Sequence, residues 1–220
     1  MRCLYCHNPD TWETGRGQEM TAAELIELFN KNRAFYNNGG ITVTGGEPLL
    51  QIDFLLELFT LAKEQGINTC IDTSGVTFTP SDGEYRCKLD RLMELTDLVM
   101  LDIKHINSEK HHSLTGFGNE NILAFARYLD EKRVPAWIRH VLVPKITDDE
   151  QHLSELGAFM GTLSNVQALD VLPYHTMGVA KYREMGIPYP LEGVPQSDRE
   201  AARKARSVIL KSFREAKTNS

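Results

Sequence analysis

Two cysteines, Cys3 and Cys6, stand three residues apart near the start of the chain, in the stretch CLYCHN. Two thiolates at this spacing are typical ligands of zinc or of an iron–sulfur cluster. Such sites normally take about four ligands, so the pair supplies only part of one. The residues alone leave open half of a structural zinc site, a redox pair or part of a cluster site.

Polar residues follow each of five short apolar runs. Ligands bind at the carboxyl ends of the strands in parallel α/β proteins, so these polar groups are expected to form one site. Strand alternation also puts Met100, Asp102 and Lys104 on one side of their strand, where a buried carboxylate and ammonium must pair or bind a ligand. The runs ITVT, INTCI, DLVML, VPAWI and ALDVL lead into Gly45-Gly46-Glu47-Pro48, Asp72-Thr73-Ser74-Gly75, Asp102-Ile103-Lys104, Arg139-His140 and Pro173-Tyr174-His175.

Each group taken alone also has a purely structural interpretation. The stretch from Gly45 to Pro48 is compatible with a strand-to-helix turn, in which glycines adopt positive φ and proline begins the helix. Asp102 and Lys104 are compatible with a structural ion pair, and Asp72 with a helix cap. The coincidence of polar groups at five strand ends favours a functional site.

The elements that must position these groups alternate along the chain. Thr21 with Glu24 forms a capping box, and Gly66 is the glycine that ends a helix. Five strands, each followed by a helix, predict an α/β fold with a parallel sheet. The strands are predicted at Ile41–Thr44, Ile67–Asp72, Leu98–Ile103, Val134–Val143 and Val166–Leu172. The helices are predicted at Thr21–Asn30, Asp53–Gln65, Lys88–Leu95, Asn119–Lys132, Asp149–Leu163 and Ser197–Ala216.

Several residues fall outside the predicted site. The stretch Gly178–Gln196, rich in Gly, Pro and Tyr, predicts a long loop that covers a site. His111 and His112 follow a charged stretch and are expected to be solvated. Cys70 lies in an apolar strand as a small hydrophobe, and Cys87 is assigned no role.

Composition narrows the class of protein. The 220 residues fit one domain, taken as residues 1–220. Lys and Arg number 24 and Asp and Glu 30, so the net charge of −6 does not favour a nucleic-acid partner. No apolar run has the length of a membrane span and no secretory leader is recognised, so no membrane association is expected. Because Cys3 and Cys6 stand at metal-ligand spacing, we expect a protein of the reducing cytoplasm rather than one held together by disulfides.

CLYCHN followed by VTGGEPLLQ resembles the radical S-adenosylmethionine superfamily, whose signature is CxxxCxxC with a Gly-Gly-Glu segment on the next strand. The later segments CIDTSG, TDLVMLDIKHIN, WIRHVLVP and LPYHTMGVAKYREMGIPYPLEGV resemble, in order and spacing, the activases of glycyl radical enzymes. The resemblance implies a single domain folded as a partial TIM-like (β/α) barrel. The signature needs a cysteine four residues before Cys3, and the chain begins two residues before it. We therefore expect an N-terminal truncation that removes the first strand and the first cluster cysteine.

The resemblance also implies roles for individual residues. Catalytic roles fall to Cys3, Cys6, Lys104 and Arg139, with the two cysteines as ligands of a [4Fe–4S] cluster. S-adenosylmethionine would be bound by Tyr5, Cys6, His7, Gly46, Glu47, Asp72, Thr73, Asp102, Ile103, Lys104 and His175. A monovalent cation would be held by Asp72, Thr73, Met100 and Asp102.

The implied reaction is reductive cleavage of S-adenosylmethionine at the cluster to a 5′-deoxyadenosyl radical, which generates a glycyl radical on pyruvate formate-lyase. The expected partners are that enzyme and a one-electron reductant such as flavodoxin, and the chain is expected to be monomeric. Two alternatives stay open. One is a radical enzyme that acts on another glycyl radical enzyme or on a small molecule; the other is an inactive or zinc-binding remnant, because the first cluster cysteine is absent.

Overall fold

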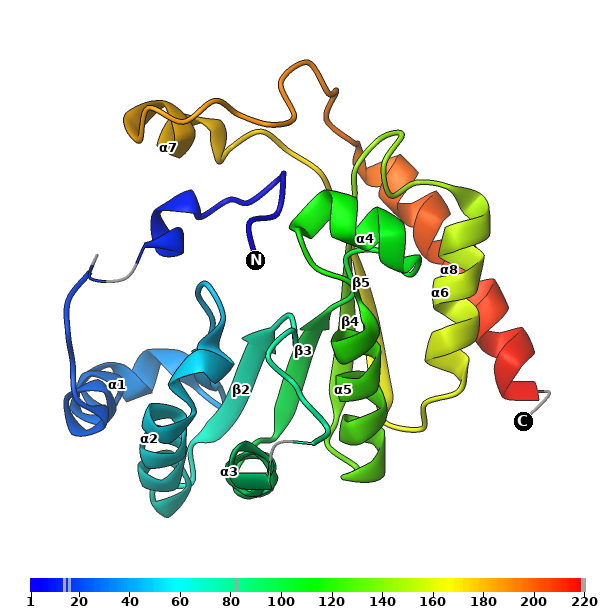
Figure 1. Cartoon of the computed structure of the whole chain (residues 1–220). Helices are drawn as coiled ribbons and strands as arrows, with labels where there is room; N and C mark the ends of the chain where they lie inside the picture. Colours follow the sequence, from blue (N-terminus) through cyan, green and yellow to red (C-terminus); the bar gives the residue numbers. More distant parts are fainter. Residues whose placement is uncertain (14, 16, 82, 219–220) are drawn as a thin grey trace.

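The computed structural model describes residues 1–13, 15, 17–81 and 83–218 (Figure 1). Five parallel strands form one sheet in the order β1-β2-β3-β4-β5, so that each strand pairs with its neighbour in sequence. This sequential order is the strand order of a (β/α) barrel rather than of a doubly wound sheet. The predicted α/β fold and all five strands are confirmed. The strands are β1 (Gly40–Val43), β2 (Asn68–Thr73), β3 (Leu98–Asp102), β4 (Ala136–Leu142) and β5 (Val166–Pro173).

All six predicted helices are present, and α8 at the chain's end packs against α6 and β5. Short helical segments fill the connections at the carboxyl ends of the strands, on the side where the N-terminal segment and α7 lie (Figure 1). The long helices are α1 (Ala22–Tyr36), α2 (Ile52–Glu64), α3 (Gly83–Glu94), α5 (Glu120–Glu131), α6 (Glu150–Gly161) and α8 (Arg199–Thr218). The short segments are η1 (Pro9–Trp12), η2 (Pro48–Gln51), α4 (Ser108–Thr115) and α7 (Val179–Glu184).

Local sequence signals fix where helices begin and end. At the start of α1 the backbone N–H of Glu24 donates to Thr21 Oγ1 over 3.2 Å, and the Thr21 N–H donates to Glu24 Oε2 over 2.7 Å. This is the predicted capping box, and loss of such a cap costs about 1 kcal/mol. After α2, Gly66 adopts φ +65° and its N–H donates to the Lys63 carbonyl, which ends the helix as predicted.

The two faces of the sheet differ in what they carry. The buried core packs between the sheet and the long helices, and includes Ile71, Val99 and Ile138, all fully buried. Because side chains alternate along a strand, the residues between them point to the opposite, concave face. Asp72, Met100, Asp102 and Arg139 lie on that face and are half-buried.

The structure corrects several sequence predictions. Helix α3 begins at Gly83 rather than at Lys88, and α4 was not predicted because its sequence is too polar to show an apolar stripe. The predicted loop over Gly178–Gln196 contains α7, a helix of six residues. His111 is fully buried rather than solvated, since it lies on the inner side of α4 and its Nδ1 is 2.6 Å from the Phe117 carbonyl.

Three further residues singled out in the sequence can also be placed in the fold. His112 is exposed, as predicted, and the cysteines Cys70 and Cys87 lie in β2 and α3. Among the helices that the structure describes, none has both the length and the apolar character needed to cross a membrane.

Candidate functional site

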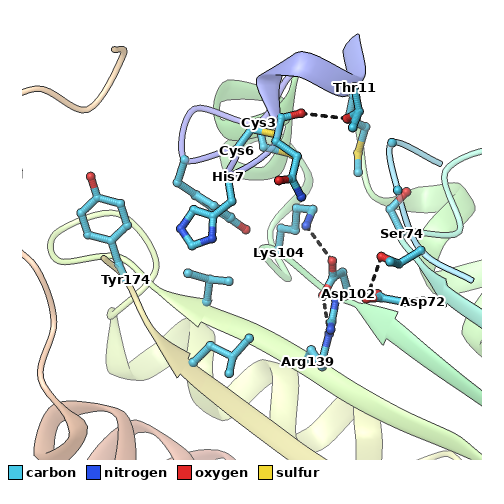
Figure 2. A pocket seen from close by; sticks show the side chains of 18 of the residues that line it. Cys3, Cys6, His7, Thr11, Asp72, Ser74, Asp102, Lys104, Arg139 and Tyr174 are labelled. Carbon is cyan, nitrogen blue, oxygen red and sulfur yellow. Dashed lines mark hydrogen bonds and ion pairs between the residues drawn. The ribbon is translucent and has the colours of Figure 1, made fainter. Parts of the chain in front are cut away.

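A cavity of about 670 Å³ lies where the N-terminal segment meets the carboxyl ends of the strands. Figure 2 shows Cys3, Cys6 and His7 on one side of it, and Asp72, Asp102, Lys104 and Arg139 on the other. The structure therefore brings together groups that the sequence places as far apart as the first and last strands. The predicted site residues that line the cavity are Cys3, Tyr5, Cys6, His7, Gly46, Asp72, Thr73, Asp102, Lys104, Arg139 and His175.

Four charged side chains form a continuous network on the strand side of the cavity. Arg139 bridges two carboxylates: its Nη2 is 2.5 Å from Asp72 Oδ1 and its Nε is 3.1 Å from Asp102 Oδ1. Lys104 Nζ lies 2.9 Å from the other oxygen of Asp102. Arg139 sits beside Asp102 because β3 and β4 pair these two residues in register. The planar guanidinium presents its N–H groups in a rigid fork, so it holds the two carboxylates in a fixed relative orientation.

The network sets the charge of its members. Burial raises the pKa of the Asp102 carboxyl, but Lys104 and Arg139 outweigh burial and hold that pKa below its usual value. Burial would lower the pKa of Lys104, yet Asp102 raises it well above the ordinary value. Asp72 differs: burial dominates and raises its pKa, against the opposing effect of Arg139. At neutral pH the site thus holds a permanently charged Arg–Asp–Lys triad.

The cysteines lie on a loop that forms a tight turn. The Cys6 N–H donates to the Cys3 carbonyl over 3.0 Å, and the Leu4 N–H donates to the carbonyl of Leu114 at the end of α4, also over 3.0 Å. Cys3 is buried, with 8% of its surface exposed, and burial raises the pKa of its thiol. Burial makes such a thiol slow to react, and a metal that binds it displaces its proton.

Aromatic side chains surround this loop. Tyr5 is buried, its ring centroid lies 5.6 Å from Lys104 Nζ, and burial raises the pKa of its hydroxyl. The ring of His7 lies 4.1 Å from the ring of His175, and burial lowers the pKa of His7. Tyr5 also belongs to a small apolar cluster with Tyr174 that is separate from the main core. The loop is therefore packed from the sheet side and from the segment after β5.

Three predicted site residues do not line the cavity. The Glu47 carboxylate accepts hydrogen bonds from the Ser74 N–H, over 3.1 Å, and from the Ser74 and Thr73 hydroxyls, so it braces the loop after β2. Ile103 points into the main core and is fully buried. Met100 lies on the concave face, below the lining residues.

The sequence did not single out some residues that contribute to the site. Thr44 lines the cavity, and its hydroxyl donates to Asp72 Oδ2 over 3.1 Å; its place at the end of the run ITVT was a usable signal. Trp12 also lines the cavity, and no sequence pattern marks it. Within the described ranges, the Trp12 Nε1, Tyr5 Oη and His175 Nδ1 atoms are buried without a hydrogen-bond partner. Buried polar atoms in that state need a partner, which bound water or a polar ligand in the cavity would supply.

The donor set can be compared with the cofactors that the sequence implies. Cys3 and Cys6 supply two thiolates on one tight turn, which suits an iron–sulfur cluster but accounts for two of the three protein ligands. No group of three or more His, Cys, Asp or Glu side chains among the described residues could hold a metal ion. The rest of the cavity offers cationic, anionic and aromatic groups together, and these suit a zwitterion joined to an aromatic base, as S-adenosylmethionine is.

Comparison with known proteins agrees with the geometry. The sequence pattern of the Radical SAM superfamily matches residues 1–156. The chain is 53% identical to the pyruvate formate-lyase-activating enzyme of Listeria monocytogenes, over 95% of the chain and 85% of the relative. It is 50% identical to the enzyme of the same name from Streptococcus mutans, over 95% of the chain and 80% of the relative.

Solved structures share the fold. A domain of pyruvate-formate lyase-activating enzyme from Bacteroides vulgatus has a TM-score of 0.62 at 24% identity, over 79% of this chain and 94% of that one. A radical SAM methyltransferase from Sphaerobacter thermophilus has a TM-score of 0.68 at 17% identity, over 96% of this chain and 60% of that one. With its cysteine loop, its strand-end network and these relatives, the chain belongs to the radical S-adenosylmethionine superfamily of enzymes.

Proposed function

We propose that the chain activates pyruvate formate-lyase by placing a radical on one of its backbone glycines. The choice of substrate rests on relatives that are 50–53% identical over 95% of the chain and carry the name of that activity. The observation that carries the chemistry is the joining of the cysteine loop and the charged network in one cavity. A glycine has no side chain, so a glycine loop of a partner protein can enter such a cavity.

Cys3 and Cys6 would hold a [4Fe–4S] cluster as two of its ligands. When bound and reduced, the cluster would supply the electron for splitting S-adenosylmethionine into methionine and a 5′-deoxyadenosyl radical, which would take a hydrogen atom from glycine. The chain's own residues would bind and orient S-adenosylmethionine. Lys104 and Arg139 carry the fixed positive charge that a methionyl carboxylate needs, and Gly46 lets the backbone approach the amino group.

The remaining assignments follow the walls of the cavity. Tyr5 and His7, on the cysteine loop, and His175 opposite them would contact the cofactor, with His175 toward the adenosyl part. Glu47 would act through the Thr73–Ser74 loop that it braces. A monovalent cation on Asp72, Thr73, Met100 and Asp102 would have to share the carboxylates that Arg139 bridges. The electron donor would be a flavodoxin-type reductant. The chain would act as a monomer in a reducing cytoplasm.

Two measurements test the proposed function in sequence. Iron and acid-labile sulfide are determined after anaerobic reconstitution of the chain with the remaining signature cysteine supplied upstream of Cys3; binding of zinc alone, with no sulfide, would support the zinc-remnant alternative and overturn the activase function. The loaded protein is then mixed with S-adenosylmethionine, a low-potential reductant and pyruvate formate-lyase. We expect a glycyl doublet by electron paramagnetic resonance, with 5′-deoxyadenosine formed in proportion.

The control is pyruvate formate-lyase with its target glycine changed to alanine, which should abolish the doublet. If 5′-deoxyadenosine forms while wild-type pyruvate formate-lyase stays diamagnetic, the substrate is another glycyl radical enzyme or a small molecule. That outcome would leave the superfamily chemistry intact and overturn the proposed partner.

A further inference from the structure

The loop that carries Cys3 and Cys6, residues 3–12, contains no strand in the part of the chain that the structure describes, and η1 is its one helical turn. Segments from the far end of the chain surround it. Figure 1 shows the N-terminal segment and α7 on the same side of the molecule, and η1 and α7 are in contact. We call residues 174–187, which include α7, the clasp.

Gly178 marks the closest approach of the clasp to the cysteine loop. Its φ of −71° and ψ of −17° are ordinary for any residue, so backbone conformation does not require glycine there. Space does. A Cβ at this position would lie 3.0 Å from His7 Cα and 3.2 Å from the Cys6 carbonyl oxygen. Both contacts are with backbone atoms, so a side chain would push the loop away.

Lys181 ties the clasp to the loop one helical turn further on. Its Nζ lies 2.8 Å from Asn8 Oδ1, and 3.0 and 3.2 Å from the two carboxylate oxygens of Asp10. The ammonium thus holds both ends of the turn that follows the cysteines. The side chain of Lys181 is 41% exposed and that of Asp10 is 45% exposed, so the two form a surface ion pair rather than a buried one.

Aromatic contacts complete the joint. Tyr182 is fully buried, and its ring meets the Trp12 ring edge-on with the centroids 5.7 Å apart. On the side of the cysteines, the His7 ring lies 4.1 Å from the His175 ring. The clasp therefore contacts the part of the loop that follows the cysteines, at His7, Asn8, Asp10 and Trp12.

We propose that the clasp fixes the geometry of the cysteine loop, with Lys181 as a positioning residue and Gly178 as the residue whose missing side chain lets the two segments meet. Residues 168 or more positions later in the chain thereby set the position of the two thiols. The inference rests on the proposed function only in that this loop is the one proposed to hold the cluster. Lys181 acts through Asn8 and Asp10 and does not contact the reacting atoms.

The test is the rate at which iodoacetamide alkylates each cysteine of the metal-free chain, followed by mass spectrometry under anaerobic, reducing conditions. The chain supplies its own controls, because Cys70 in β2 and the exposed Cys87 in α3 are both outside the clasp and the loop. We expect Lys181→Met to raise the alkylation rate of buried Cys3 about fivefold, as loss of a surface ion pair with an added hydrogen bond predicts. Gly178→Ala should change Cys3 in the same direction.

The conservative variant Lys181→Arg keeps the positive charge and should restore a rate near that of wild type. Three results would overturn the inference: an unchanged Cys3 rate in both Lys181→Met and Gly178→Ala, an equal rise at Cys70, or an Arg variant as fast as the Met variant. An equal rise at Cys70 would mean general loosening of the fold. The measurement needs no cluster, S-adenosylmethionine or partner protein, so failure of the activase function would leave its result unaffected.

Discussion

The cavity has two halves that are held in different ways. The strand-borne half consists of Asp72, Asp102, Lys104 and Arg139, which sit at the carboxyl ends of three adjacent strands and pair with one another. The loop-borne half is the cysteine loop, residues 3–12, which is held by contacts with α4 and with the clasp. Sheet register sets the positions of the side chains in the strand-borne half. Packing between the two ends of the chain sets the position of the cysteine loop.

This difference predicts how mutations affect the stability of each half. In the strand-borne half the charged groups are mostly buried, with 12–21% of each side chain exposed, so loss of one partner leaves another charge unpaired in the interior. In the loop-borne half the ion pair is more than 40% exposed on both sides, so its loss lets water in without stranding a buried charge. Mutations in the first half should therefore lower global stability, and mutations in the second should loosen the loop alone.

The largest effect is expected from Asp102→Ala. This change leaves Lys104 buried without its partner and should lower the free energy of unfolding by about 3 kcal/mol while the domain stays folded. It should also weaken S-adenosylmethionine binding at least about tenfold, because the lost charged hydrogen bonds orient Lys104 and Arg139. Urea unfolding and cofactor titration measure the two effects.

The matched control for Asp102→Ala is Asp53→Ala, which removes an exposed ion pair with Lys88. That change should cost at most about 1 kcal/mol and leave cofactor affinity unchanged. Equal costs for the two variants would contradict the burial difference on which the comparison rests. A large loss of stability in Asp102→Ala with unchanged affinity would mean that the pair is structural.

An intermediate effect is expected from pH, with opposite signs for the two carboxylates. The pKa of Asp102 lies below its ordinary value of 3.8, so ionised Asp102 stabilises the folded state above pH 3.8, and this is lost as the pH falls through the lowered pKa. The pKa of Asp72 is raised, so the contribution of Asp72 to stability falls as the pH rises from 3.8 through the raised pKa.

Urea unfolding of Asp102→Asn and Asp72→Asn between about pH 3 and 7 separates these signs. As the pH rises, the stability of wild type relative to Asp102→Asn should grow, and that of wild type relative to Asp72→Asn should shrink. Each change should be about 1.4 kcal/mol for every pH unit by which the folded and unfolded pKa differ. Parallel slopes for the two variants would show that Arg139 stabilises both carboxylates alike.

The smallest effect is expected in the clasp that holds the loop-borne half, from Tyr182→Phe. Among the described residues the Tyr182 hydroxyl is buried without a hydrogen-bond partner, so its removal should change the free energy of unfolding by less than about 0.5 kcal/mol. Tyr174→Phe is the comparison, since the Tyr174 hydroxyl lies 2.8 Å from that of Tyr189; its loss should cost about 1 kcal/mol. A larger cost for Tyr182→Phe than for Tyr174→Phe would show that the Tyr182 hydroxyl has a polar partner in solution.

The sequence by itself determined the strand-borne half. Alternation places Asp102 and Lys104 on one side of their strand, and parallel pairing brings the strand ends together, so the gathering of Asp72, Asp102 and Arg139 at one edge of the sheet follows from local patterns. Other local signals predicted the Thr21 cap, the Gly66 helix end and five parallel strands, whereas their sequential order was established by the structure. The sequence did not reveal α4 or the burial of His111, because a short polar helix has no periodic apolar stripe to mark its inner side.

Only the tertiary structure decided the loop-borne half. The CxxC spacing identified the thiols, but nothing local indicates that Lys181 reaches Asp10, or that Gly178 lies against His7. Likewise, Glu47 was expected at the cofactor, and the structure turns it onto Ser74. These contacts join segments 27 to 171 residues apart without a shared sheet register, so their partners depend on how the whole chain packs, and no sequence period encodes that.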